Sequence, residues 1–147
     1  MGLSVDTINA MQEIHRGITG VKTAPDVANY PAQLNQVDCP MVLVWPGDAT
    51  WTRETINESD DTRSIYTVTV FVAPAATGMR GELIVKALDC ADALREYYQS
   101  DDGQTLNGFV EITGPDEIRY TGLRTIKYND IDWYALQVIV PTVQQTA

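Results

Sequence analysis

The residues best suited to chemistry are few and lie far apart in the chain. The sequence has one histidine, His15, and two cysteines, Cys39 and Cys90. A nucleophile needs a base within hydrogen-bond reach, yet neither cysteine sits in a recognisable motif and their spacing is far from the C-x-x-C of zinc sites. We therefore expect His15 to be a packed or solvated helix residue, and both cysteines to be small buried side chains that stay reduced.

Acidic residues form three short groups, Asp60-Asp61, Asp101-Asp102 and Asp130-x-Asp132. A hard cation requires several converging oxygen ligands, and none of these groups has the spaced ligand series of a calcium loop. Each group falls at a predicted turn, where aspartate is favoured for its own backbone hydrogen bonds. The sequence thus predicts turn residues, with no metal site, no catalytic residue and no cofactor.

Sites for phosphate and nucleic acid are weakly supported. The chain lacks the G-x-x-x-x-G-K and G-x-G-x-x-G loops, and Gly78-Met79-Arg80-Gly81 offers only free N–H groups before a predicted helix. A flexible helix start explains that segment equally well. Lys and Arg total 10 against 20 for Asp and Glu, giving a net charge of −10, whereas binders of nucleic acid need a basic stripe.

Aromatic residues are the least ordinary feature. Some must belong to the core, but Trp51 lies beside Arg53 and the pair Tyr97-Tyr98 lies close to Arg95. Because Trp, Tyr and Arg dominate binding hot spots, these groups are candidates for interface anchors.

Hydrophobic periodicity predicts two helices and six strands. Apolar residues at spacings of three and four indicate helices over Ser4 to about Thr19 and Met79–Tyr98. The first helix leads into a polar stretch, 21–40, that is too long for a turn and is expected to wrap over the domain or contact a neighbour. The six expected strands are Met41–Trp45 (closed by a turn at Pro46-Gly47), Thr50–Ile56, Tyr66–Val72, Phe109–Thr113, Ile118–Tyr128 and Ile131–Val140.

The order helix, three strands, helix, three strands predicts an α+β fold. We expect a mixed or antiparallel sheet of about six strands with both helices on one face. The last two strands face each other across Asn129-Asp130, a two-residue hairpin, and the final strand is expected to be central or covered by a neighbour. With 147 residues, 44% of them hydrophobic, the chain is expected to form one domain over 1–147. No apolar run is long enough to span a membrane and no signal peptide is evident, so synthesis in a cytoplasm is expected.

This succession of elements resembles the tail terminator proteins of long-tailed, lambda-like bacteriophages. The resemblance runs from about Ser4 to Val140 and includes Cys39-Pro40-Met41-Val42-Leu43-Val44-Trp45-Pro46-Gly47, a Thr-rich hairpin with an acidic tip, and Tyr66-Thr67-Val68-Thr69-Val70-Phe71-Val72. It implies a hexameric ring in the tail or neck of a virion, which stops growth of the tail tube and gives the head a docking surface. The implied partners are other copies of the chain, the tail tube protein and a head-completion or connector protein, with DNA passing through the lumen without specific binding.

The loop 57–63 is then a candidate contact with the tube or the lumen, although an idle surface loop explains it as well. The residues expected at a subunit or tube interface are Trp51, Arg53, Asp60, Asp61, Arg63, Tyr97, Tyr98 and Trp133.

Three other interpretations stay open. The chain is also compatible with another head–tail connector or tail-completion protein, with a small non-catalytic binding or adaptor module that has an apolar pocket, and with a metal-dependent enzyme built on the Asp pairs. A stable oligomer favours the ring subunit, a monomer with a concave pocket favours the binding module, and stabilisation by metal favours the enzyme.

Overall fold

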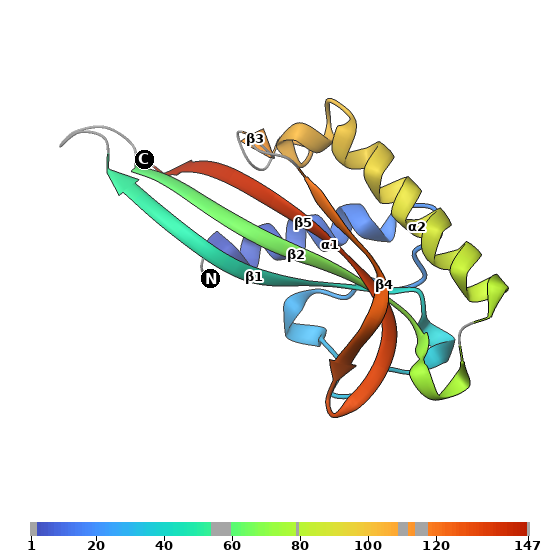
Figure 1. The fold of residues 1–147 in the computed structure, drawn as a ribbon. Coiled ribbons are helices and arrows are strands. Elements are labelled where there is room, and N and C mark those ends of the chain that lie inside the picture. Colours follow the sequence, from blue (N-terminus) through green and yellow to red (C-terminus); the bar gives the residue numbers. More distant parts are fainter. Residues whose placement is uncertain (1–2, 54–59, 79, 109–111, 114–117, 147) are drawn as a thin grey trace.

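The fold is built on one antiparallel sheet whose long strands run side by side (Figure 1). The computed structural model describes residues 3–53, 60–78, 80–108, 112–113 and 118–146. In it β1 (Met41–Arg53) pairs with β2 (Asp60–Pro74), and β2 pairs with β5 (Ile131–Thr146). The far edge of β5 is shared by β4 (Arg119–Tyr128) and the two-residue β3 (Ile112–Thr113). The sheet is therefore four strands wide.

The prediction of about six strands is wrong, although the α+β class is correct. The predicted turn at Pro46-Gly47 does not exist, because β1 runs through it with a β-bulge between Pro46 and Ala49 and so joins two predicted strands. Proline is tolerated here since β1 is an edge strand. The Val44 N–H points away from β2 to the Tyr30 hydroxyl at 2.8 Å, and two residues later the nitrogen of Pro46 also faces outward.

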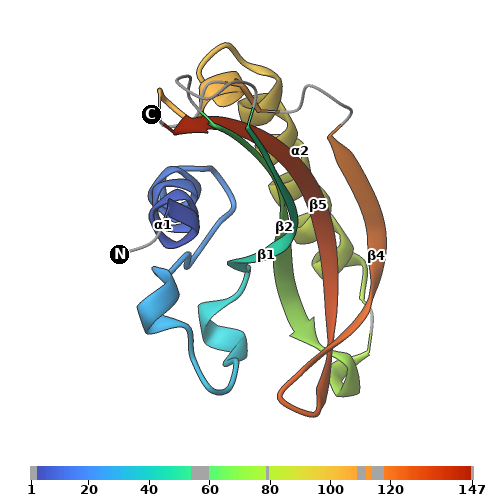
Figure 2. The ribbon, with the colours of Figure 1, turned by 90° about the vertical axis from the view of Figure 1, so that its left-hand side faces the viewer.

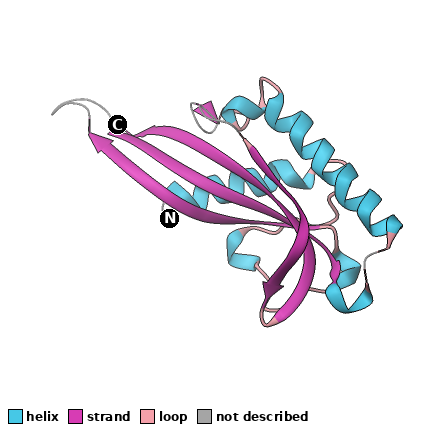
Figure 3. Ribbon diagram, in the orientation of Figure 1, coloured by secondary structure: helices cyan, strands magenta, loops and turns pink. Residues whose placement is uncertain are grey.

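Two helices cover one face of the sheet (Figure 3). These are α1 (Leu3–Arg16) and α2 (Gly81–Gln99). Cross-strand partners share a face, so the pairs Val42–Val70 and Val68–Val138 define one side, and both helices pack into the cluster that these valines form. The placement of both helices on one face follows the prediction. In Figure 2, α1 lies along the concave side of the curved sheet.

The hydrophobic core has two parts. The larger part lies between the helices and the sheet and includes Ile8, Met11, Leu83, Ala87, Leu94 and Leu136. The smaller part lies on the opposite face at one end of the sheet and consists of Cys39, Met41, Leu43, Phe71, Trp133 and Ala135. Trp45, Phe71 and Tyr128 pack edge to face or tilted there, with ring centroids 5.5–6.2 Å apart.

The stretch 21–40 covers the outer edge of β1, as the prediction of a wrapping segment requires. Thr23 bridges to Met41, and the Val42 N–H donates to the Thr23 carbonyl at 2.9 Å. The Tyr30 hydroxyl also donates to the Val44 carbonyl at 2.8 Å. Short 3₁₀ turns, Val27–Asn29 and Gln36–Asp38, shape the segment, and two more follow β2 and α2 at Ala75–Thr77 and Gly103–Thr105. This part of the β1 edge is thereby closed to further strands.

Two predictions about the C-terminal strands are confirmed. Asn129 and Asp130 both have positive φ, 49° and 66°, and Tyr128 pairs with Ile131, which is the geometry of a two-residue type I′ hairpin. β5 is a central strand, with β2 on one side and β4 and β3 on the other. The predicted strand Phe109–Thr113 is described only at Ile112–Thr113, and the predicted turn at Gly114-Pro115-Asp116 lies outside the described residues.

Candidate interaction surface

His15 is part of a buried hydrogen-bonded chain rather than of an open cleft. It is 0% exposed, its Nδ1 lies 2.9 Å from Gln12 Oε1, and its Nε2 lies 2.7 Å from the Tyr98 hydroxyl. Gln12 Nε2 donates to the carbonyls of Val42 and Pro25 at 2.8 and 2.9 Å, which turns Oε1 toward the histidine. Nδ1 therefore carries the proton and Nε2 accepts from Tyr98. Burial lowers the pKa of His15 to about 3, so the ring is neutral in neutral solution.

Both cysteines are buried and free. Burial raises the pKa of Cys39 to about 11 and that of Cys90 to about 12. The thiolate is the reactive form of cysteine, so both thiols are poor nucleophiles at neutral pH.

The acidic groups do not converge. Asp101-Asp102 lie in the turn after α2, Asp130 lies in the hairpin turn, and Asp132 pairs with Lys127 at 3.3 Å. Within the described ranges, no three His, Cys, Asp or Glu residues group together in a way that could hold a metal ion. In the weak anion candidate before α2, the described Arg80 is held by Glu82 at 3.2 Å, and Met79 lies outside the described residues.

The residues expected at an interface have several different environments. Tyr98 and Trp133 are 2% and 3% exposed and pack in the two parts of the core, so neither offers surface in this chain. Tyr97 is half-buried and donates to Asn107 Oδ1 at 3.1 Å, and burial followed by the nearby Asp102 raises its pKa to about 12. Arg63 is exposed on β2.

The other interface candidates lie near the ends of β1 and β2. The backbone pairs Trp51 with Thr62, Thr52 with Asp61 and Arg53 with Asp60, whereas the side chains of Trp51, Arg53, Asp60 and Asp61 lie outside the described part of the chain. Of the candidate loop 57–63, only residues from Asp60 onward are described, and they belong to β2.

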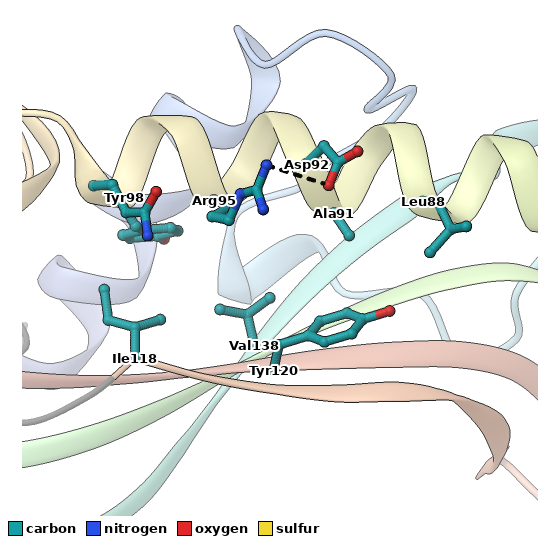
Figure 4. A pocket seen from close by; sticks show the side chains of 9 residues that line it. Leu88, Ala91, Asp92, Arg95, Tyr98, Ile118, Tyr120 and Val138 are labelled. Atoms are coloured by element: carbon teal, nitrogen blue, oxygen red, sulfur yellow. Dashed lines mark ion pairs between the residues drawn. The ribbon is translucent and has the colours of Figure 1, made fainter.

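A groove lies between α2 and β4, beside exposed apolar side chains of α2 (Figure 4). Its volume is about 260 Å³. From α2, Leu88, Ala91 and Arg95 face the sheet, while Ile118, Tyr120 and Val138 face the helix. Arg95 lies 3.7 Å from Asp92, and both side chains are largely exposed, so this ion pair contributes little to stability. The groove suits an apolar side chain from a binding partner.

The exposed apolar side chains on α2 were missed by the sequence reasoning. Ile84 and Leu88 share the helical spacing of the buried residues of α2, but they are 38% and 46% exposed, and the neighbouring Val85 is 57% exposed. The buried stripe consists of Leu83, Ala87, Cys90, Ala91, Leu94 and Tyr98. Apolar residues outside the core-facing stripe of a helix indicate a second contact surface. The sequence of α2 contains such residues.

Comparison with known proteins adds no identity. No protein-family model matches the chain, and no curated protein matches it. Among the described residues, neither helix has the length and apolar character to cross a membrane.

Proposed function

We propose that this chain is a structural, non-catalytic ring subunit of a long-tailed bacteriophage, a tail terminator that caps the tail tube and offers the head a docking surface. The proposal draws on the resemblance of the sequence from Ser4 to Val140. The observation that carries it is which side chains are buried and which are exposed. The histidine and both cysteines are buried, whereas Ile84, Val85 and Leu88 lie exposed together on α2. Such apolar exposure is typical of a site of protein–protein contact.

The long strands support the same proposal. β1, β2 and β5 contain 13, 15 and 16 residues, and in Figure 1 their ends extend past both helices. At about 3.3 Å per residue, such strands span roughly 45–50 Å. The strand ends that extend past the helices would let a small subunit reach the tail tube or a neighbouring subunit.

In this proposal the protein resides in the tail or neck of the virion. Its partners are other copies of itself, the tail tube protein and a head-completion protein. Six copies at −10 give a ring of about −60, which repels DNA moving through the lumen instead of binding it.

The test is the mass of the purified protein by light scattering across concentration and salt, with and without tail tubes assembled from tube protein. A six-subunit particle, or rings that appear on the ends of added tubes, is the expected result. A strict monomer that leaves tube growth unchanged contradicts the proposal.

The groove between α2 and β4 favours one alternative, a small binding module. Its mainly apolar lining suits a peptide with an apolar side chain. That alternative predicts a monomer in which a peptide of this type shifts the NMR signals of Leu88 and Tyr120, while added tubes have no effect.

A further inference from the structure

The side of β4 that faces away from β5 is an open edge of the sheet. β4 pairs with β5, and no described strand pairs with it on its other side. Tyr128 and Ile131 close the two-residue hairpin, so their backbone groups point toward each other. Direction alternates along a strand, so the N–H and C=O groups of Thr125 and Lys127 point away from β5. Both residues are exposed. This side of β4, the β4 edge, can therefore pair with a further strand.

The opposite edge of the sheet is partly covered, which makes the β4 edge distinctive. At β1 the Tyr30 hydroxyl bonds both the N–H and the carbonyl of Val44 at 2.8 Å. Between described residues, no such bond reaches the outward backbone groups of Thr125 and Lys127. The fold covers the start of one edge and leaves the other to solvent.

The apolar groove lies on the helix side of the β4 edge (Figure 4). Tyr120 of β4 and Leu88 of α2 line it and are 50% and 46% exposed. Asp92 and Arg95 also line it, but they pair with each other at 3.7 Å, so their charges balance. Side chains of an added strand would alternate between the two sides of the sheet, and those on the helix side would meet this groove. Apolar side chains suit these positions.

The other side of the β4 edge is positively charged. β4 contains Arg119, Arg124 and Lys127 and no acidic residue. Lys127 is paired with Asp132 at 3.3 Å, whereas the exposed Arg119 and Arg124 take part in no ion pair within the described ranges. The β5 residues that pair with these two arginines are uncharged. Since opposite charges on neighbouring strands stabilise a sheet, acidic side chains suit these positions of an added strand.

Compensation from elsewhere in the sheet is remote. Strand register puts Asp61 on the same side of the sheet as Arg119, but Asp61 pairs with Gln145 and Arg119 with Ile139. These partners are six positions apart on β5 (145 − 139), which is roughly 20 Å along a strand. That separation is well beyond the Debye length of about 8 Å in physiological salt.

We propose that the β4 edge binds an extended segment of another protein, in which apolar and acidic residues alternate, as an added strand. The outward main-chain groups select an extended segment, the groove selects its apolar side chains, and the two arginines select its acidic ones. This site goes beyond the proposed function and does not depend on a ring. A ring subunit would use it to hold a neighbouring protein of the virion.

A second copy of the chain suits the β4 edge less well. Pairing of β4 with β4 would bring together two strands that each carry three cations and no acid, and like charges on neighbouring strands destabilise a sheet. The part of β1 beyond its covered start, 46–53, contains one acid, Asp48, and one cation, Arg53. It thus has no excess of acid to offer.

The test uses the whole chain and a blocked eight-residue peptide that alternates valine and glutamate. Such a strand spans roughly 26 Å, enough to reach from Lys127 to the groove. At saturating peptide, hydrogen exchange of the Thr125 and Lys127 amides should slow at least about tenfold. The amides of Ile126 and Tyr128 are internal controls, because they point toward β5 and should exchange slowly with and without peptide.

Modified peptides test the binding mode. Lysine in place of glutamate should weaken binding at least about tenfold, because like charges then face Arg119 and Arg124. N-methylation of alternate residues removes the N–H groups on one side of the peptide strand. Methylation of the side that faces β4 should abolish binding, and methylation of the other side should be tolerated. Binding that survives both methylations overturns strand addition.

Variants of the protein test the two sides of the edge. Leu88→Asn should weaken binding, whereas Val85→Asn is the matched control, because Val85 is exposed on α2 but does not line the groove. Arg119→Glu/Arg124→Glu should reverse the preference, so that the lysine peptide binds more tightly than the glutamate peptide. This gain of binding excludes misfolding as the cause. Lys22→Glu, at an exposed site away from β4, should leave the preference unchanged.

The remaining outcomes separate this site from the proposed function. A wild-type chain that binds neither peptide, or binds one without protection at Thr125 and Lys127, overturns the strand site. Protection that is present without peptide and rises with protein concentration shows that a second copy occupies the edge, which also overturns it. Light scattering of the same samples reports on the ring. Rings that bind no peptide leave the proposed function standing, and a strict monomer that binds the peptide supports the strand site while contradicting the ring.

Discussion

His15 and Tyr98 are joined by a 2.7 Å hydrogen bond inside the core, 83 positions apart in the chain. The bond links the end of α1 to the end of α2, and Gln12 extends it to the carbonyls of Val42 on β1 and Pro25 in the covering segment. Every polar atom in this chain of contacts has a partner, which is the condition under which a buried polar network stabilises a unique packing.

Removal of the Tyr98 hydroxyl should destabilise the protein. Tyr98→Phe leaves His15 Nε2 without its donor in a fully buried site, so we expect the free energy of unfolding to fall by about 1–3 kcal/mol in urea titrations. Tyr97→Phe is the matched control, because its hydroxyl bonds the exposed Asn107, and it should cost less than about 1 kcal/mol. Equal losses for the two variants would contradict the role of the buried bond.

The same network predicts how stability depends on pH. Burial lowers the pKa of His15 from the ordinary 6.5 of histidine to about 3 in the folded chain, so below pH 6.5 the unfolded chain binds a proton that the folded chain does not. The contribution of neutral His15 is fully present above pH 6.5 and is lost as pH falls toward 3, at up to about 1.4 kcal/mol per pH unit.

A difference between two variants isolates this effect from the many carboxylates that titrate in the same range. His15→Gln removes the titrating group. The difference in the free energy of unfolding, wild type minus His15→Gln, should therefore decrease as the pH is lowered from 6.5 to 4. A difference that stays constant over this range would show that His15 does not remain neutral in the folded state.

Gly103 should tolerate no side chain. A Cβ there would lie 2.0 Å from the Tyr97 carbonyl oxygen and 2.8 Å from the Tyr98 Cα, both backbone atoms that cannot move without disturbing the end of α2. We expect Gly103→Ala to lower the free energy of unfolding by about 2 kcal/mol or more. Gly81→Ala is the control, since nothing lies within 4 Å of its Cβ position, and it should be neutral or slightly stabilising. A Gly103→Ala protein that melts with the wild type would refute the close approach.

The sequence predicted the helices and the C-terminal hairpin well because their signals are local. The apolar spacing of α2 and the pair Asn129-Asp130 each specify a structure within a few residues. The strand count failed at Pro46-Gly47, where a local turn signal was overridden by pairing with β2. A proline is tolerated within a strand where its nitrogen points away from the paired strand. Which strand pairs on which side is set by tertiary structure.

The candidate surface was harder to predict for a related reason. Tyr98 and Trp133 have residue types that suit interfaces, but their partners in the fold, His15 for one and Phe71 with Leu43 for the other, place them in the core. Conversely, Arg63 on β2 and Arg119 and Arg124 on β4 lie on one face of the sheet through a strand register that no local pattern reveals. Arg63 was chosen from the sequence as the last residue of the candidate loop 57–63, whereas only the pairing of β4 with β5 places Arg119 and Arg124 on the same face of the sheet.

The hairpin turn offers a substitution that should stabilise the protein. Asp130 has φ of 66°, a conformation that glycine adopts at little steric cost, and Asn-Gly is the preferred sequence of a type I′ turn. Asp130 is exposed and its own side chain takes part in no ion pair among the described residues. We therefore expect Asp130→Gly to raise the free energy of unfolding by up to about 1 kcal/mol, measured by thermal and urea unfolding. Asp130→Val provides the opposite test, because a β-branched residue is strained at this φ and should destabilise the hairpin. Two variants that shift stability in the same direction would show that the turn is not type I′ in solution.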